Sequence, residues 1–469
     1  MRILATAIVQ RLQSAGHEAF WVGGCVRDTL LGKEPKDYDI ATSARPEEVE
    51  RLFRQTIPVG RQFGVLLVVE NGISFQVATF RQEADYRDGR HPEQVTFAGA
   101  RADARRRDFT INGLFFDPVG QALHDWVGGR EDLEQRRIRT IGRPEERFAE
   151  DHLRLLRVVR FAAQLDFTIE PETLEAVGRM ANRIVSVSAE RIREELIRLF
   201  APPHAAAGLE SLRSSGLLPR VLPEAVPLLT CDQSPEYHPE GTVYEHVRRM
   251  LALLPADADP ALPWAVLLHD IAKPASATRD PSSGVIHFYG HERLGAVMAE
   301  ELLTRLRFPR RLIDQVVACV RHHMQFKDVR RMRRATLRKM LLRPTFALEL
   351  ELHRLDCLGS HGLLDHYEFL QQQQREFDAQ PALRPPLVNG NDLLALGWKP
   401  GPALGEALSE IRDLQLQEEL RSRDEALAWA RQRQARAQEP GRGDAEEPPL
   451  AGFEQKAAKD RKDQTGFQD

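Results

Sequence analysis

Residues 23–42 read GGCVRDTLLGKEPKDYDIAT, and this stretch decides the fold prediction for the first part of the chain. The pair Gly23-Gly24 follows the apolar run Phe20-Trp21-Val22 and lets backbone amides approach an anion closely. Asp37 and Asp39 stand two residues apart, so in an extended strand both carboxylates point to one side. Two like charges so close repel each other unless a cation lies between them. The stretch therefore predicts a phosphate cradle followed by a carboxylate pair that binds Mg²⁺, as a metal-triphosphate substrate requires.

The residues around this stretch predict an α+β fold. Up to about residue 120, short apolar runs alternate with glycine turns, which indicates a mixed sheet with one or two helices. After about residue 145 the β-branched runs fade and apolar residues recur at helical spacing. We therefore expect an N-terminal mixed sheet with helices, followed by a mostly helical remainder.

Composition excludes several classes of protein. The 469 residues are 42% hydrophobic and 29% charged, which is ordinary for a soluble globular protein. The net charge is −4, so a nucleic-acid partner would have to be held by local basic clusters. Four distant cysteines without a CxxC pair argue against a disulfide framework, and no apolar run approaches the roughly 18 residues of a membrane span. We expect a cytoplasmic protein without a membrane partner.

Further motifs follow the opening stretch in a fixed order. They are Thr79-Phe80-Arg81, the segment YRDGRHP at 86–92, the segment RRDFTING at 106–113 and the segment EDHLR at 150–154. Together with GG-x-VRD-x-LLG and D-x-D-I-AT, they resemble the class II tRNA nucleotidyltransferase and bacterial poly(A) polymerase family. The resemblance implies template-independent addition of nucleotides to an RNA 3′ end, with CTP and ATP as substrates and tRNA or another RNA 3′ end as the partner.

The resemblance also implies a role for each matched residue. Asp37 and Asp39 are the expected catalytic Mg²⁺ ligands. Asp151 and Arg154 are expected to read the edge of the incoming base, because a carboxylate and a guanidinium supply both an acceptor and donors; three residues apart on one helix, they would share a face. The full set of expected nucleotide-binding residues is Gly23, Gly24, Arg27, Arg107, Asp108, Asn112, Asp151, Arg154, Arg157 and Arg160.

One residue departs from the family pattern. Many relatives carry a third acidic residue just before the T-x-F-R block, where this chain has Gln76. Glutamine accepts a hydrogen bond but cannot act as a base. The segment from Arg81 to Val95 resembles the flexible loop that relatives use in switching toward ATP, which speaks against an enzyme restricted to adding cytidines.

The middle of the helical part is rich in histidine. His246, the pair His269-Asp270 and the late Asp356 resemble the metal set of the HD phosphohydrolase fold, with His291 and His322 or His323 as a second site. Imidazole and carboxylate together suit Mn, Ni, Fe or Zn. Two interpretations remain open: a hydrolase that cleans RNA ends, or a helical body that grips RNA and keeps the histidines as remnants.

The predicted boundaries are 1–145 for the nucleotidyltransferase head, 146–230 for a helical neck and RNA-binding region, 231–370 for the HD domain, 371–437 for a linker and C-terminal helix, and 438–469 for a disordered tail. The predicted function is CCA or terminal-A addition to tRNA. The alternatives are a poly(A) polymerase, an HD-domain phosphohydrolase with a weakened head, and an RNA-binding protein that has lost catalysis. The oligomeric state stays open.

Overall fold

The computed structural model describes residues 1–86, 92–234, 238–380, 383 and 385–438, without the side chains of Gln62, of residues 82–95 and of residues 437–438. The chain divides into two compact units. The first comprises residues 1–330 and 344–371, and the second comprises residues 331–343 and 372–469. Most of the predicted tail lies outside the described residues. Among the described residues, no helix combines the length and the apolar character that crossing a membrane requires.

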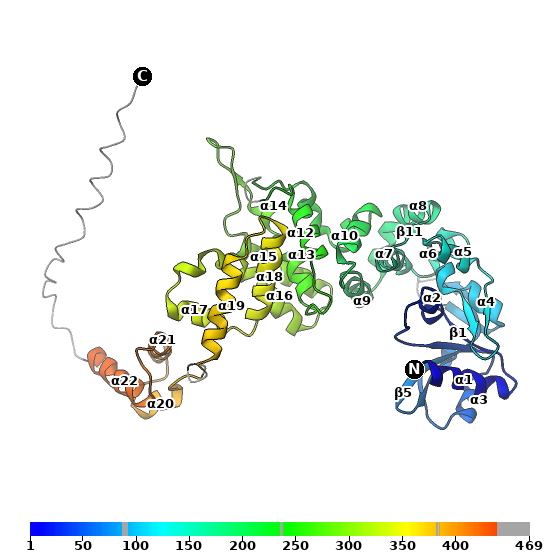
Figure 1. Cartoon of the computed structure of the whole chain (residues 1–469), viewed down its shortest axis with the longest axis horizontal. Coiled ribbons are helices and arrows are strands. Elements are labelled where there is room, and N and C mark those ends of the chain that lie inside the picture. Colours follow the sequence, from blue (N-terminus) through cyan, green and yellow to red (C-terminus); the bar gives the residue numbers. More distant parts are fainter. Residues whose placement is uncertain (87–91, 235–237, 381–382, 384, 439–469) are drawn as a thin grey trace, which may run out of the picture. The chain divides into compact units, whose positions relative to one another are not determined.

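The N-terminal part of the first unit is built on a mixed sheet (Figure 1). Among the described residues its strand order is β3-β4-β5-β2-β1-β8-β9. Strand β2 pairs with β5 in parallel and with β1 in antiparallel fashion, so the sheet is mixed, as predicted. The strands are β1 (Ala19–Val22), β2 (Asp39–Thr42), β3 (Thr56–Gly60), β4 (Val65–Glu70), β5 (Ile73–Thr79), β8 (Phe115–Asp117) and β9 (Ala122–His124). In the segment predicted as the flexible loop, β6 (Arg81–Tyr86) pairs with β7 (Pro92–Phe97) in antiparallel fashion, and residues 87–91 lie outside the described residues.

The two faces of the sheet are covered differently. On one face, Trp21, Ile40 and Val77 pack in a core with the helices α1 (Arg2–Ser14) and α3 (Pro46–Leu52). On the other face, Phe20, Val22, Ala41 and Phe115 pack with Phe80 and the helix α4 (Ala100–Arg105). The strand period places Asp39 of β2 and Gln76 of β5 on this second face as well.

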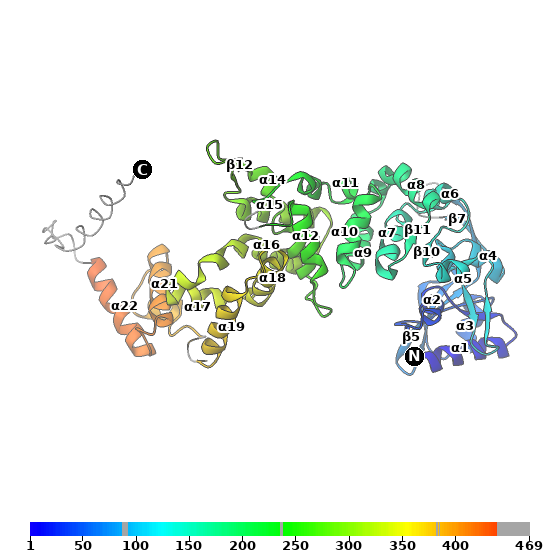
Figure 2. The same ribbon diagram turned by 45° about the horizontal axis from the view of Figure 1, so that its top comes forward.

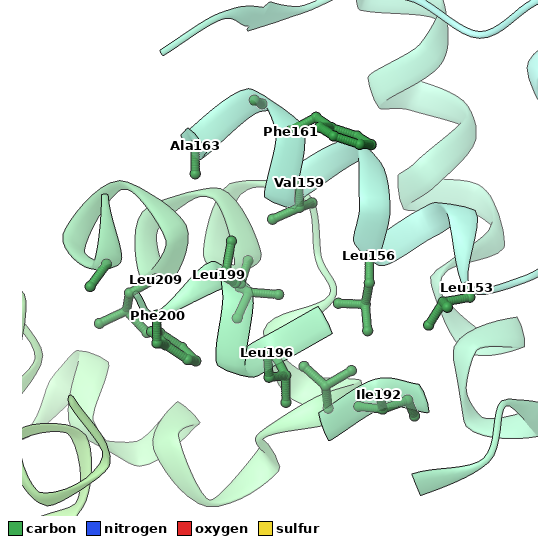
Figure 3. Packing of buried hydrophobic residues seen from close by; sticks show 14 of the residues in the cluster. Leu153, Leu156, Val159, Phe161, Ala163, Ile192, Leu196, Leu199, Phe200 and Leu209 are labelled. Carbon is green, nitrogen blue, oxygen red and sulfur yellow. The ribbon is translucent and has the colours of Figure 1, made fainter. Parts of the chain in front are cut away.

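A helical segment follows the sheet and shares its core. Helix α7 (Arg154–Leu165) packs against α9 (Ala189–Leu199) and α10 (Ala205–Ser214), and Figure 2 shows these helices from a second side. Figure 3 shows apolar side chains of all three helices gathered between them, among them Leu156, Leu196 and Leu209. The neighbouring elements are α2 (Gly24–Leu30), α5 (Gly129–Glu134), α6 (Pro144–Glu150), α8 (Pro171–Met180), β10 (Arg137–Ile138) and β11 (Thr168–Ile169).

The histidine-rich segment completes the first unit. Its helices α12 (Val243–Ala252), α13 (Leu262–Leu268), α16 (Arg310–His322) and α18 (Phe346–Gly359) pack on one another, and α15 (His291–Arg305) packs on α16. The shorter elements are α11 (Leu218–Val221), α14 (Lys273–Ser276), β12 (Thr278–Arg279) and β13 (Ile286–His287), and α19 spans Asp365–Asp378. The 3₁₀ segments of the chain are η1 (Arg61–Phe63), η2 (Thr110–Asn112), η3 (Ala181–Ser186), η4 (Pro223–Thr230) and η5 (His323–Arg331).

The second unit has its own small core. Apolar residues of α20 (Gly390–Ala395), α21 (Pro402–Leu416) and α22 (Arg423–Gln438) pack together around Leu393 and Ile411. Helix α17 (Arg334–Leu341) packs on α21. The prediction of one C-terminal helix is wrong: the chain breaks between α21 and α22, where Glu418 takes a positive φ of 66° and the Ser422 hydroxyl caps the next helix by accepting a bond from the Glu425 amide.

Candidate active site

Asp37 and Asp39 lie on the same side of an extended segment. Tyr38 between them is buried and packs its ring on Trp21, with ring centroids 4.8 Å apart. Asp37 is exposed and Asp39, the first residue of β2, is half-buried. Burial and then the negative charge of Asp37 raise the pKa of Asp39, while Arg107 opposes this rise. A carboxylate whose charge is disfavoured by burial and by a neighbouring carboxylate is suited to bind a divalent cation together with that neighbour.

Gln76 is the neighbour of Asp39 in the sheet. The parallel register pairs Ile40 with Val77 and Ala41 with Ala78, so the preceding residues Asp39 and Gln76 are next to each other. Val77 points into the core, whereas Gln76 is exposed on the same face as Asp39. The structure therefore brings Gln76 to the aspartate pair.

The glycine turn allows an arginine to approach the backbone. Gly23 has a φ of +72°, and a Cβ atom there would lie 3.0 Å from the Nη1 atom of Arg107. Helix α2 begins at Gly24. Arg27 on this helix donates from Nη1 to the Asn112 Oδ1 atom at 2.8 Å and from Nε to Asp28 at 2.8 Å.

Asp108 links the loop at 106–113 to helix α7. Its Oδ1 atom accepts bonds from the Phe109 amide (2.8 Å) and the Asn112 Nδ2 atom (3.2 Å). Its Oδ2 atom accepts two bonds from Arg157, at 2.8 Å from Nε and 2.6 Å from Nη2. Burial alone would favour the neutral acid, but the Arg157 charge lowers the pKa of Asp108 to about 2. The carboxylate is therefore ionised and anchored at neutral pH.

Arg107 is held on the other side of the same loop. Its Nη2 atom lies 3.1 Å from the Oδ2 atom of the buried Asp103, and its guanidinium stacks over the ring of Phe115. Arg106 binds the Oδ1 atom of Asp103 at 2.7 Å. Asp103 was not singled out in the sequence; its signal is the spacing of three and four residues to the two arginines.

Asp151 and Arg154 do not share a helix, which corrects the expectation. Asp151 lies in the break between α6 and α7 with extended dihedrals (φ −147°, ψ 106°), and Arg154 is the first residue of α7. The break persists because the Asp151 Oδ1 atom accepts a bond from the Leu153 amide at 3.1 Å. Arg154 donates to the carbonyl oxygen of Arg147 (2.8 Å) and forms an ion pair with Glu150.

Helix α9 supplies the partners of Asp151 and Arg160. Arg191 donates to both oxygens of Asp151. Four residues later on the same face, Glu195 is buried and pairs with the Nε atom of Arg160 at 2.5 Å. Arg160 is itself buried, so in this structure it faces α9, and Arg157 faces Asp108. The spacing of Arg191 and Glu195 is the signal that could have identified this face.

A second group of polar residues lies in the histidine-rich segment. The structure brings His246 on α12, His269 after α13 and Asp356 on α18 within 4.8 Å of one another. A second triplet, with ligand atoms equally close, comprises Asp270, His291 and His323. The Asp270 Oδ2 atom lies 3.1 Å from His269 Nε2, so Asp270 contacts both groups. His322, the other candidate for the second site, instead places Nδ1 at 3.1 Å from the Oε1 atom of Glu349.

All four imidazoles point Nε2 toward the cluster. His269, His291 and His323 face backbone carbonyl oxygens with Nδ1, at 2.9, 2.6 and 2.7 Å, and His246 faces Glu240 with Nδ1 at 2.7 Å. These acceptors assign the proton to Nδ1 and leave an Nε2 lone pair directed inward. His291 Nε2 and His323 Nε2 are 3.0 Å apart, and His246 Nε2 is 3.1 Å from Asp356 Oδ1. Facing lone pairs at such distances need a cation or a proton between them.

Comparison with known proteins identifies the family. Residues 19–139 match the model of the poly A polymerase head domain, 166–229 match the probable RNA and SrmB-binding site of polymerase A, and 293–430 match tRNA nucleotidyltransferase domain 2 (putative). The CCA-adding enzyme of Levilactobacillus brevis is 45% identical over 215 residues, which are 46% of this chain and 54% of that protein. The chain thus spans about half the length of this relative. The CCA-adding enzyme of Anoxybacillus flavithermus is 32% identical over 435 residues, which are 91% of this chain and 96% of that protein.

Solved structures agree with this assignment. The crystal structure of the Bacillus stearothermophilus CCA-adding enzyme in complex with CTP has a TM-score of 0.70 and 28% identity, covering 92% of this chain and 97% of that one. The Thermotoga maritima CCA-adding enzyme complexed with tRNA has the same fold, with a TM-score of 0.52 and 20% identity over 91% of this chain and 94% of that one. The predicted mixed sheet with a mostly helical remainder is confirmed. The chain belongs to the family of CCA-adding enzymes.

Proposed function

We propose that this chain adds CTP- and ATP-derived nucleotides to the 3′ end of tRNA without a nucleic-acid template. The observation that carries the proposal is the aspartate pair on the exposed face of the sheet, with Arg107 close enough to Asp39 to oppose the rise in its pKa. Asp37 and Asp39 would hold Mg²⁺, which activates the RNA 3′-hydroxyl and stabilises the leaving pyrophosphate. Family membership and the neighbour bound to CTP support the same reaction.

The other residues have separate tasks in this proposal. The Gly23 turn and Arg107 would receive the triphosphate beside the aspartates. Arg27, Asn112, Asp108 and Arg157 form a continuous chain of hydrogen bonds that holds the loop at 106–113 against α7. At the break before α7, Asp151 and Arg154 would select the base, since cytosine and adenine each present a donor and an acceptor on the edge that is read.

A product-length assay tests the proposal. Three tRNA transcripts, ending before CCA, after CC and after CCA, are incubated with Mg²⁺ and with CTP, ATP or both, and products are resolved at single-nucleotide length. Addition of CCA to the first transcript supports a CCA-adding enzyme. One adenosine on the CC-ended transcript alone indicates A addition, and long adenosine tails indicate a poly(A) polymerase. No extension on any transcript contradicts the proposal.

The inward-facing imidazoles favour a second function, metal-dependent hydrolysis of phosphate esters in the histidine-rich segment. Nε2 of His246 and Nε2 of His269 are buried and face carboxylate oxygens of Asp356 and Asp270, each at 3.1 Å, which fits a site for a cation. His246, His269, Asp270 and Asp356 would hold the first ion, and His291, His323 and Asp270 a second. Imidazoles with carboxylates suit Mn, Ni, Fe or Zn, which activate water for attack on phosphorus.

Metal analysis and a hydrolase assay test this second function. Purified protein is assayed for bound transition metal and for release of phosphate from RNA 3′-phosphates and for opening of 2′,3′-cyclic phosphates. Metal-stimulated turnover that His269→Ala abolishes, with nucleotide addition unchanged, supports the hydrolase. Absence of bound metal and of any stimulation by added metal contradicts it. We expect both activities to operate in the cytoplasm, where the four free cysteines stay reduced.

A further inference from the structure

Glu240 differs from every other residue that supports the imidazole cluster. His269, His291 and His323 each direct Nδ1 to the carbonyl oxygen three residues earlier on the chain, which is an uncharged acceptor. His246 instead directs Nδ1 to the Glu240 Oε1 atom at 2.7 Å. Glu240 precedes α12 in a turn, and it was not singled out in the sequence.

The environment of Glu240 is unusual for a carboxylate. Its side chain has no exposed surface, and its Oε2 atom has no hydrogen-bond partner. Among the described residues, the groups that pair with it are two imidazoles, His246 and His238, the latter at 2.9 Å. An ionised carboxylate is costly to bury unless positive charge lies near it. A dication at the Nε2 side of His246 would supply that charge through the imidazole ring.

We propose that Glu240 is a positioning residue of a transition-metal site formed by His246, His269 and Asp356. Its carboxylate accepts a hydrogen bond from Nδ1 of His246 and thereby fixes the ring so that Nε2 faces His269 and Asp356. The same hydrogen bond makes Nε2 a stronger electron-pair donor to a metal ion. Of the two metal sites, the one that contains His246 therefore binds its ion more tightly, because the three other imidazoles direct Nδ1 to neutral carbonyl oxygens. The inference rests on the metal centre proposed above and assigns it an order of occupancy.

A second arrangement of the same residues would have different consequences for the variants tested below. His238, Glu240 and His246 also lie within 4.8 Å of one another and could hold an ion directly. In that arrangement His246 would bind the ion through Nδ1, and His238 and Glu240 would both be direct ligands of the ion. In the proposed arrangement His238 is only a second partner of Glu240, so its loss leaves the His246–Glu240 contact in place.

Metal binding to the full-length protein tests the inference. Co²⁺ is titrated into apo-protein and followed by its visible absorbance and by calorimetry. We expect Glu240→Gln, which keeps an acceptor but removes the charge, to weaken the tighter site by about 10- to 100-fold. The matched control His238→Asn is expected to leave Co²⁺ affinity within about threefold of the parent, and Glu240→Asp is expected to recover part of the affinity.

The outcomes separate the inference from the proposal on which it rests. Parent protein that binds no Co²⁺ overturns both. Parent and Glu240→Gln proteins with equal affinity overturn the role of Glu240 alone, as does a loss in His238→Asn as large as that in Glu240→Gln. A histidine-selective ¹⁵N spectrum of the parent apo-protein gives an answer that does not depend on the folding of any Glu240 variant. It is expected to show His246 protonated at Nδ1, and protonation at Nε2 alone overturns the inference.

Discussion

Arg191 donates two hydrogen bonds to the carboxylate of Asp151, from Nη1 to Oδ1 at 3.1 Å and from Nη2 to Oδ2 at 2.7 Å. The two residues are forty positions apart, and about a fifth to a quarter of each side chain is exposed. A bidentate pair of this kind fixes the orientation of the carboxylate as well as its charge. The acceptor expected to read the base is therefore oriented by α9.

Replacing Arg191 with glutamine is expected to lower kcat/KM for CTP and ATP by about 10- to 100-fold, because a loosened Asp151 misplaces the base. Discrimination against UTP and GTP should fall as well. Single-nucleotide incorporation kinetics with all four nucleotides measure both effects. Arg198→Gln on the same helix, where the side chain is 57% exposed, is the control and should retain parental values. Equal losses in both variants would show only a general weakening of α9.

Gln76 lies beside Asp39, where the family resemblance places a third carboxylate, so Gln76→Glu is expected to leave kcat unchanged or raise it. A carboxylate beside Asp39 can bind metal or accept the proton of the primer hydroxyl, and general-base catalysis contributes about 10²-fold at the low end of its range. Turnover at saturating Mg²⁺ and nucleotide is the measurement, with Gln76→Ala as the control for loss of the amide. A large drop in Gln76→Glu would reveal a role specific to glutamine.

The Asp108–Arg157 ion pair makes the free energy of unfolding depend on pH in the acidic range. The pKa of Asp108 is lowered from 3.8 to about 2 in the folded chain. Because the pKa of Asp108 is lower in the folded chain, its carboxylate contributes to the free energy of unfolding. This contribution is fully present above the pKa of the unfolded chain, near pH 4, and is lost as the pH falls toward 2. The shift corresponds to about 2 kcal/mol at pH 7. We expect urea unfolding to show Asp108→Asn less stable than the parent by about this amount at pH 7, with the difference shrinking between pH 4 and pH 2. A difference that stays constant over that range contradicts this prediction.

The head was predictable from sequence because its signals are local. Alternating burial around Tyr38 follows from the strand period, and Gly23 takes the positive φ that glycine tolerates. The break at Asp151 was not predictable, because the apolar pattern runs across it and the side-chain bond to the Leu153 amide decides the backbone path. The neighbour relation of Asp39 and Gln76 required the register of two strands that are far apart in the chain.

The histidine-rich segment shows the same limit. The order of its histidines and aspartates was readable, but the structure groups His246 with His269 and Asp356, and Asp270 with His291 and His323. The choice between His322 and His323 depended on which ring the end of α16 turns inward, and only the packed helices decide that. Glu240 carried no signal, because a lone acidic residue in a turn looks solvent-exposed until its surroundings are known.

The most direct test of nucleotide addition at the aspartate pair is tRNA extension by the parent protein and by Asp39→Asn, with transcripts that lack the CCA end and with CTP, ATP and Mg²⁺ present. The parent is expected to extend the transcript, and the variant to lose about 10³-fold in rate, because metal stabilisation of the reacting charges amounts to several kcal/mol. Hydrolase activity in the histidine-rich segment should be the same in both proteins. An Asp39→Asn protein that extends tRNA at the parental rate would contradict a catalytic role for the aspartate pair.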